Sequence, residues 1–180
     1  QILRDEPVAQ SAKNSPRKSK KGKNVTLQSN FLEGNKNEDD WAVNSKKWRM
    51  IGTGLEVNRT GGVVSKTKFK DVDVVEIYVT KGEAEWTGTP ANCSLVVNIW
   101  GVDLRFPDMK KGGEHAVRLL RRDKQIAYSI NGGSPKVAFI EKGPSEPAAI
   151  RITFTTLDST RSGTLTFHGI IVRGGEAIKD

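Results

Sequence analysis

Apolar and polar residues alternate with a period of two along most of the chain after residue 40. In the segment 71–80, Val75, Ile77 and Val79 alternate with Val74, Glu76 and Tyr78. Side chains on a β-strand point to opposite faces in turn, and Val, Ile, Tyr and Thr suit such a half-buried surface. Helical spacing is weak throughout. The pattern therefore predicts β-strands as the dominant element.

Turn residues divide this pattern into strands that pair as hairpins. Gly52–Gly54 separates two apolar runs, and Asn131-Gly132-Gly133 closes another. About ten strands at regular spacing, joined by Gly, Asn, Asp and Pro turns, predict an all-β, antiparallel two-sheet sandwich. The segments that we expect to form strands are 48–57, 63–69, 71–80, 94–106, 115–122, 125–131, 137–140, 149–156 and 163–174.

The length and the charge distribution indicate one domain preceded by a basic tail. The chain has 180 residues, a length that suffices for one domain with a substantial core. Its net charge is +8. Residues 1–23 contain seven Lys and Arg against two acids, and the stretch SAKNSPRKSKKGK within them has almost no apolar residues to bury. We expect 1–23 to be a flexible linker and 24–180 to be the β-sandwich.

The tail also suggests partners. Its lysines, concentrated in 13–23, favour attachment to nucleic acid or to an anionic surface, although no aromatic residues accompany them. A solvated linker is the simpler interpretation. The chain opens QILRDEPVAQ, without Met, and contains no transmembrane stretch. We therefore expect it to be attached to a larger polypeptide.

The segment 94–106 is the best place to look for function, because polar groups gather on one side of its predicted hairpin. Leu95, Val97 and Ile99 alternate toward the core, as do Leu104 and Phe106 after a turn near Gly101. The opposite, outer face is then predicted to carry Asn98, Trp100, Asp103 and Arg105. An indole can stack on a sugar ring while amide, carboxylate and guanidinium groups bind its hydroxyls. A plain solvated face with an Arg–Trp contact is the alternative.

The other tryptophans divide into two groups. Trp41 and Trp48 open the first strands and are expected in the core. Trp86 lies in the polar stretch KGEAEWTGTPAN, where an apolar ring has no evident reason for burial. It is therefore a second candidate for ligand contact, with anchoring of the loop as the alternative.

Catalytic chemistry finds little support in the sequence. Glycoside hydrolysis normally needs two carboxyl groups that flank one bond, and only Asp103 and Glu114 lie beside the candidate face. His115 and His168 show no metal-ligand spacing, and a single cysteine excludes an intrachain disulfide. We predict no metal site and no cofactor from these residues.

Five segments follow one another in a suggestive order of motifs: 41–57, 66–72, 92–95, 115–133 and 163–174. This order resembles that of the concanavalin A-like lectin and glucanase jelly rolls, and is most similar to the 3-keto-disaccharide hydrolase group among them. The resemblance covers about residues 40–174, with Asn98 where that group has an Arg.

The resemblance implies a jelly roll with a concave sheet that takes a carbohydrate. Such folds are compatible with bound calcium, and the group favours an extracytoplasmic or secreted location. A fold does not confer an activity, so the sequence leaves two carbohydrate functions open. We favour a lectin-like, non-catalytic domain for glycan binding or adhesion, with a keto-sugar glycoside hydrolase as the alternative.

Overall fold

The computed structural model describes residues 25–31, 37–44, 48–58, 61–81, 93–106, 113–156 and 164–178. Within these ranges the chain forms fifteen β-strands and no α-helix, so no helix there could cross a membrane. The strands are β1 (Val25–Asn30), β2 (Trp41–Asn44), β3 (Trp48–Ile51), β4 (Gly54–Asn58), β5 (Gly62–Ser65), β6 (Lys68–Lys70), β7 (Val74–Lys81), β8 (Cys93–Ile99), β9 (Val102–Phe106), β10 (Glu114–Arg122), β11 (Gln125–Ile130), β12 (Lys136–Phe139), β13 (Arg151–Thr156), β14 (Thr164–Arg173) and β15 (Glu176–Ile178).

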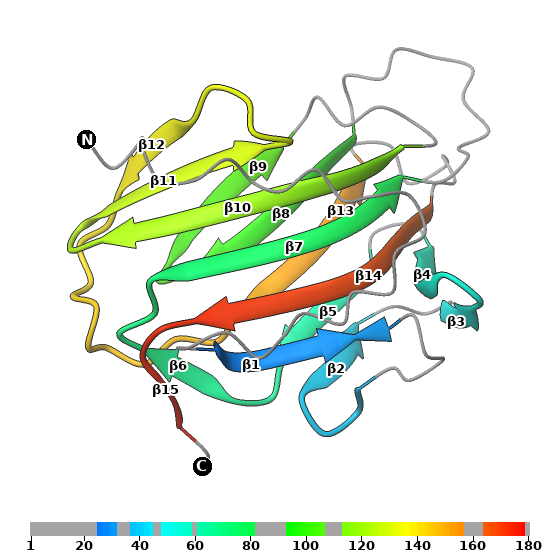
Figure 1. Ribbon diagram of the computed structural model, residues 1–180, viewed down its shortest axis with the longest axis horizontal. Helices are drawn as coiled ribbons and strands as arrows, with labels where there is room; N and C mark the ends of the chain where they lie inside the picture. The colour runs from blue at the N-terminus through cyan, green and yellow to red at the C-terminus, as the bar shows by residue number, and fades with distance from the viewer. Residues whose placement is uncertain are drawn as a thin grey trace.

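Two antiparallel sheets lie face to face. The larger sheet has eight strands in the order β12-β11-β10-β7-β14-β4-β3, with β1 also paired to β14. The smaller sheet has five strands in the order β2-β5-β13-β8-β9. Figure 1 looks onto the larger sheet, with the smaller sheet behind it. The antiparallel two-sheet sandwich predicted from the sequence is therefore confirmed.

Most hairpins form where turn residues predicted them. β3 and β4 join across Gly52-Thr53, and β10 and β11 across Asp123-Lys124. Asn131 and Gly132 both have positive φ angles, of 52° and 70°, as the turn after β11 requires. The segment 63–69 is divided between β5 and β6, which belong to different sheets. The short strands β1, β2 and β15 were not predicted.

The core lies between the two sheets and is built by the expected alternation. Val75, Ile77 and Val79 of β7 are at most 1% exposed and face the smaller sheet's Val97 and Ile152 across the core. Burying an aliphatic side chain of this size contributes about 1.5–3 kcal/mol. The period-two pattern therefore identified the core face of the long strands correctly.

Trp41 packs in this core as predicted, whereas Trp48 does not. Trp41 is 1% exposed, and its indole N–H donates a hydrogen bond of 2.7 Å to the Ser29 hydroxyl. Trp48 lies on the edge strand β3 and is 41% exposed. The prediction of a buried Trp48 was wrong, because an edge strand leaves one flank of its side chains without a neighbour.

We expect Ser29→Ala to lower the free energy of unfolding by about 1–3 kcal/mol, because the substitution leaves the buried Trp41 N–H without its acceptor. Urea unfolding followed by tryptophan fluorescence measures this change. The double variant Ser29→Ala, Trp41→Phe also removes the orphaned donor. If Ser29→Ala costs no stability, the hydrogen bond is not a structural requirement.

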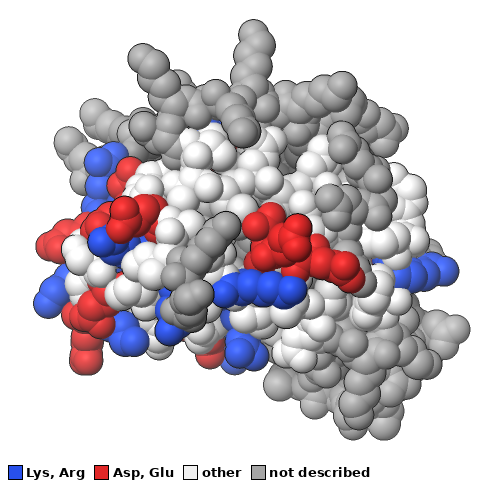
Figure 2. All heavy atoms as spheres, turned by 90° about the horizontal axis from the view of Figure 1, so that it is seen from below, with Lys and Arg blue, Asp and Glu red and all other residues white. Residues whose placement is uncertain are grey.

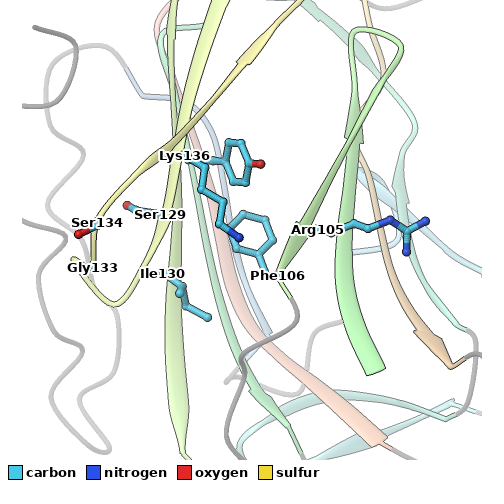
Figure 3. A pocket seen from close by; sticks show the side chains of 8 residues that line it. Arg105, Phe106, Ser129, Ile130, Gly133, Ser134 and Lys136 are labelled. Carbon is cyan, nitrogen blue, oxygen red and sulfur yellow. The ribbon is translucent and has the colours of Figure 1, made fainter. Parts of the chain in front are cut away.

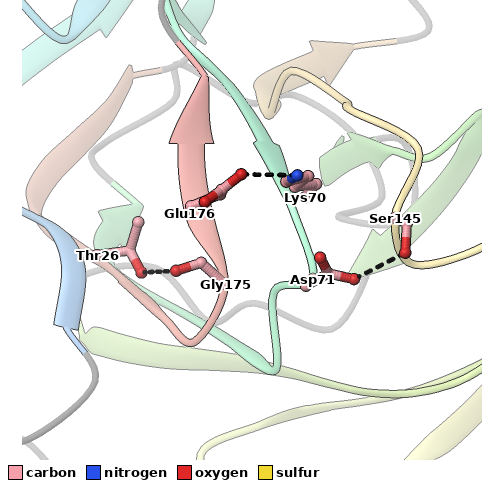
Figure 4. A network of polar contacts seen from close by, with 6 residues as sticks. All are labelled: Thr26, Lys70, Asp71, Ser145, Gly175 and Glu176. Carbon is pink, nitrogen blue, oxygen red and sulfur yellow. Dashed lines mark hydrogen bonds and ion pairs between the residues drawn. The ribbon is translucent and has the colours of Figure 1, made fainter.

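A polar network joins the short strands at one end of the sandwich. Lys70 of β6 forms an ion pair of 2.7 Å with Glu176 of β15, and Asp71 accepts a hydrogen bond from Ser145 (Figure 4). The ion pair raises the pKa of Lys70. Figure 2 shows the molecule from below, where acidic and basic side chains lie beside one another. This end of the sandwich therefore does not present a surface of a single charge.

Candidate functional site

Three of the four residues proposed for the hairpin share one solvent-facing surface. Asn98 of β8 lies directly opposite Asp103 of β9, and Arg105 lies opposite Val96. Opposed residues of antiparallel strands point to the same face, here the outer face of the smaller sheet. Asp103 and Arg105 are exposed, and Asn98 is half-buried. We call this surface the polar face.

A hydrogen bond holds the first two of these residues together. The Asn98 side-chain amide donates a bond of 2.7 Å to Asp103 Oδ1. The pair is thereby restricted in orientation before any ligand arrives. The amide oxygen of Asn98 and the second carboxylate oxygen of Asp103 remain as acceptors, a set that suits the hydroxyl groups of a polyol.

The neighbouring strand β13 adds residues to the polar face that the sequence analysis did not propose. Arg151 lies directly opposite Asn98, and Thr153 lies opposite Val96. Arg151 is exposed. The alternation of Arg151 and Thr153 with Ile150 and Ile152 was visible in the sequence. What the sequence did not reveal is that β13, fifty residues further along, pairs with β8.

Small residues and one amide occupy the β5 and β2 positions of the polar face. Val64 and Gly62 of β5 lie opposite Arg151 and Thr153, and Ala42 of β2 lies opposite Val64. The exposed Asn44 of β2 lies opposite Gly62. The charged groups therefore stand at one side of the polar face, on β9 and β13.

Trp100 is not on the polar face, and the predicted position of its ring was wrong. The hairpin turns at Trp100 and Gly101, with φ angles of 53° and 78°, so Trp100 belongs to the turn rather than to β8. Two positive φ angles match the tight turn that suits twisted strands. The left-handed backbone directs the indole into the core, where it is 3% exposed. The strand alternation that predicted an outward ring does not continue through a turn.

Arg121 occupies one side of the Trp100 ring. Its guanidinium carbon lies 4.2 Å from the ring centroid, in a cation–π contact, and Arg121 is itself 3% exposed. Nε donates to the Asp123 carbonyl at 2.9 Å and Nη2 to the Lys142 carbonyl at 2.7 Å. Burial lowers the pKa of Arg121. The pair ties the β8–β9 turn to two other connections, so its geometry is that of a structural contact.

The two carboxylates considered for catalysis do not come together. Asp103 is in β9 of the smaller sheet, whereas Glu114 is the first residue of β10 in the larger sheet. Asp103 is also the only acid in the five strands of the smaller sheet. Trp86, the second ligand-contact candidate, lies outside the described residues.

Both histidines are buried and held by hydrogen bonds. The Nδ1 atom of His115 lies 2.9 Å from Nδ2 of Asn131. His168 lies 2.7 Å from the Thr80 hydroxyl through Nε2 and contacts the Thr53 carbonyl through Nδ1. These contacts fix turns and a strand irregularity in the larger sheet. Across the described ranges, no three His, Cys, Asp or Glu residues gather as potential metal ligands.

A small cavity of about 160 Å³ lies on the other side of β9 (Figure 3). Phe106 and Tyr128 meet there edge to face, with ring centroids 5.5 Å apart. Lys136 extends over Phe106, whereas the Arg105 side chain points away from the cavity, toward the polar face. Arg105 lines the cavity at its position in β9, while its side chain points to the other face of the strand.

The sheet arrangement defines the class of the domain as a concanavalin A-like jelly roll, and comparison with solved structures agrees. The carbohydrate recognition domain of Emp47p is similar over 87% of this chain and 100% of its own, with a TM-score of 0.68 and 8% identity. The Crh5 transglycosylase in complex with NAG is similar over 87% of this chain and 88% of its own, with a TM-score of 0.60 and 13% identity. The Bacillus licheniformis β-glucanase is similar over 82% of this chain and 97% of its own, with a TM-score of 0.56 and 10% identity.

These likenesses concern the fold. No protein-family model matches the chain. No curated protein sequence matches it either. The chain therefore has the concanavalin A-like fold shared by lectins and glucanases, and its function has to be argued from its own surface.

Proposed function

We propose that this domain binds carbohydrate on the polar face and does not cleave it. The observation that carries the proposal is the pre-oriented Asn98–Asp103 pair, with Arg151 directly opposite Asn98 in the next strand. Amide, carboxylate and guanidinium groups together offer both donors and acceptors, as sugar hydroxyls require.

The shape of the polar face supports the same proposal. Gly62, Val64 and Ala42 carry no long side chain beside the polar groups, so a sugar ring that lies along β5 and β2 meets no large side chain from these three positions. The solved structures of the same fold that are named as a carbohydrate recognition domain and as a transglycosylase in complex with NAG add support.

Binding is favoured over hydrolysis because the polar face offers a single carboxylate. Glycosidases that use two carboxyl groups hold them about 5–9.5 Å apart on either side of one bond. Glu114 belongs to the other sheet, and Asp103 has no second acid in the strands beside it.

We expect Asn98→Ala and Asp103→Ala each to weaken glycan binding about tenfold or more, because each removes hydrogen bonds that involve a charged or pre-oriented group. Glycan-array screening of the full chain identifies a ligand, and calorimetry on that ligand measures the change. Glu141→Gln, an exposed acid outside both sheets, serves as the control variant.

The same samples separate binding from catalysis. Incubation with the bound glycan should release no shortened product, and Asp103→Asn should retain more binding than Asp103→Ala. Product release that disappears in Asp103→Asn or Glu114→Gln would contradict the non-catalytic proposal. Unchanged affinity in both alanine variants would remove the polar face as the binding surface.

A further inference from the structure

Two arginines stand on the polar face on either side of β8. Arg151 pairs with Asn98, and Arg105 pairs with Val96, two residues away on the same strand. From strand and residue spacing, their Cα atoms are about 12 Å apart. Both side chains are exposed, and neither forms an ion pair within the described part of the chain.

The charge of this face is therefore not neutralised from within. Asp103 supplies one negative charge and is hydrogen-bonded to Asn98, while the two guanidinium groups supply two positive charges. The remaining positions of the face that the structure describes, including Val96 and Thr153, are uncharged. A ligand lying along β8 would meet an excess of positive charge.

Trp100 contributes no aromatic ring to the polar face, because its indole is buried. With that indole buried beneath Arg121, the described strands of the polar face present no aromatic ring to the solvent. Neutral sugars obtain much of their binding energy by stacking on such rings. Recognition on this face has to depend on charge and hydrogen bonds instead.

We propose, building on the function proposed above, that the preferred ligands are acidic glycans, in which sugars carry carboxylate or sulfate groups. The planar guanidinium group binds either anion through two parallel N–H···O bonds, which a lysine cannot do. Arg105 and Arg151 recognise anionic substituents on one or two sugar units. Asn98 and Asp103 recognise hydroxyl groups between them.

The test compares matched ligands on the full chain. Oligogalacturonides carry carboxylates, sulfated galacto-oligosaccharides carry sulfates, and unsubstituted galacto-oligosaccharides of the same length carry neither. Binding is measured by calorimetry at two salt concentrations. We expect at least one acidic series to bind about tenfold or more tightly than the neutral series, with the difference shrinking as salt rises.

Single variants assign this preference to residues. Arg105→Gln and Arg151→Gln should each weaken binding of the acidic series about tenfold, and together about a hundredfold, and each should weaken binding of the neutral series by a smaller factor. Lys124→Gln, an exposed cation in the β10–β11 turn, is the control and should change nothing. The two acidic series show whether carboxylate or sulfate is preferred.

Other results overturn the proposal in distinguishable ways. Equal binding of neutral and acidic series, unaffected by the arginine variants, would leave glycan binding in place and reject the acidic preference. Absence of binding to any glycan would reject the proposed function itself. Binding of acidic ligands that persists in the arginine variants but disappears when Lys18, Lys20, Lys21 and Lys23 become Gln would assign it to the tail. Tighter binding of a DNA duplex, lost in the arginine variants, would indicate a nucleic-acid surface instead.

Discussion

Replacing Trp100 by alanine is expected to lower the free energy of unfolding by about 3–5 kcal/mol, the cost of removing a large buried aromatic side chain. The ring is 3% exposed and belongs to the main core. If the indole of Trp100 were instead an exposed stacking surface for sugars, Trp100→Ala would weaken sugar binding and leave the stability of the protein unchanged. Chemical unfolding of the variant therefore distinguishes the two roles directly.

Trp100→Gly provides the matched comparison. It removes the same ring, but glycine adopts the φ of +53° at this turn without the steric cost that alanine retains. We expect the glycine variant to be about 1 kcal/mol more stable than the alanine variant, although both are less stable than the parent. If alanine and glycine unfold at the same denaturant concentration, the left-handed backbone at this position carries no measurable strain.

Arg121→Met is expected to lower the free energy of unfolding by about 2–4 kcal/mol. The variant leaves the Asp123 and Lys142 carbonyls without their charged donor, and hydrogen bonds to charged groups contribute about 1.5–3 kcal/mol each. Relief from burying a charge offsets part of this loss, because Arg121 is 3% exposed and burial lowers its pKa. Urea unfolding measures the difference.

Two further variants show whether the buried contacts of Arg121 cause the loss of stability in Arg121→Met. Arg121→Lys keeps the positive charge but replaces the two donor nitrogens of the guanidinium group, Nε and Nη2, by one, so its stability should lie between the parent and Arg121→Met. Arg122→Met alters the adjacent exposed arginine and should cost less than about 1 kcal/mol. Equal losses at the two positions would mean that the buried contacts of Arg121 do not stabilise the fold.

Trp100 and Arg121 also help to hold the polar face in its shape. Trp100 and Arg121 together anchor the turn that joins β8 to β9 against the rest of the molecule. Asn98 and Asp103 are a few residues from that turn, one on each strand. We therefore expect loss of the anchor to weaken ligand binding by disturbing the β8–β9 turn as well as by lowering stability, and thermal and binding measurements on the same variant separate the two effects.

The sequence by itself determined the sandwich and most of its core. Val75, Ile77 and Val79 recur at every second position, so they share one face of β7, and that face lies in the main core. The same reasoning placed Asn98, Asp103 and Arg105 on one outer surface, because each lies within a regular strand. Local chemistry also located turns such as Asn131-Gly132, where positive φ angles are needed.

The tertiary structure decided the rest. The turn between β8 and β9 consists of two residues, Trp100 and Gly101, and this determines where the indole of Trp100 points. No local sequence pattern distinguishes an indole that is buried at a turn from one that is exposed there. Strand pairing across long separations brought Arg151 beside Asn98 and kept Glu114 away from Asp103. Pairing between distant strands depends on how the whole sheet packs. The sequence thus defined which faces could bind a ligand, and only the fold defined which side chains share one.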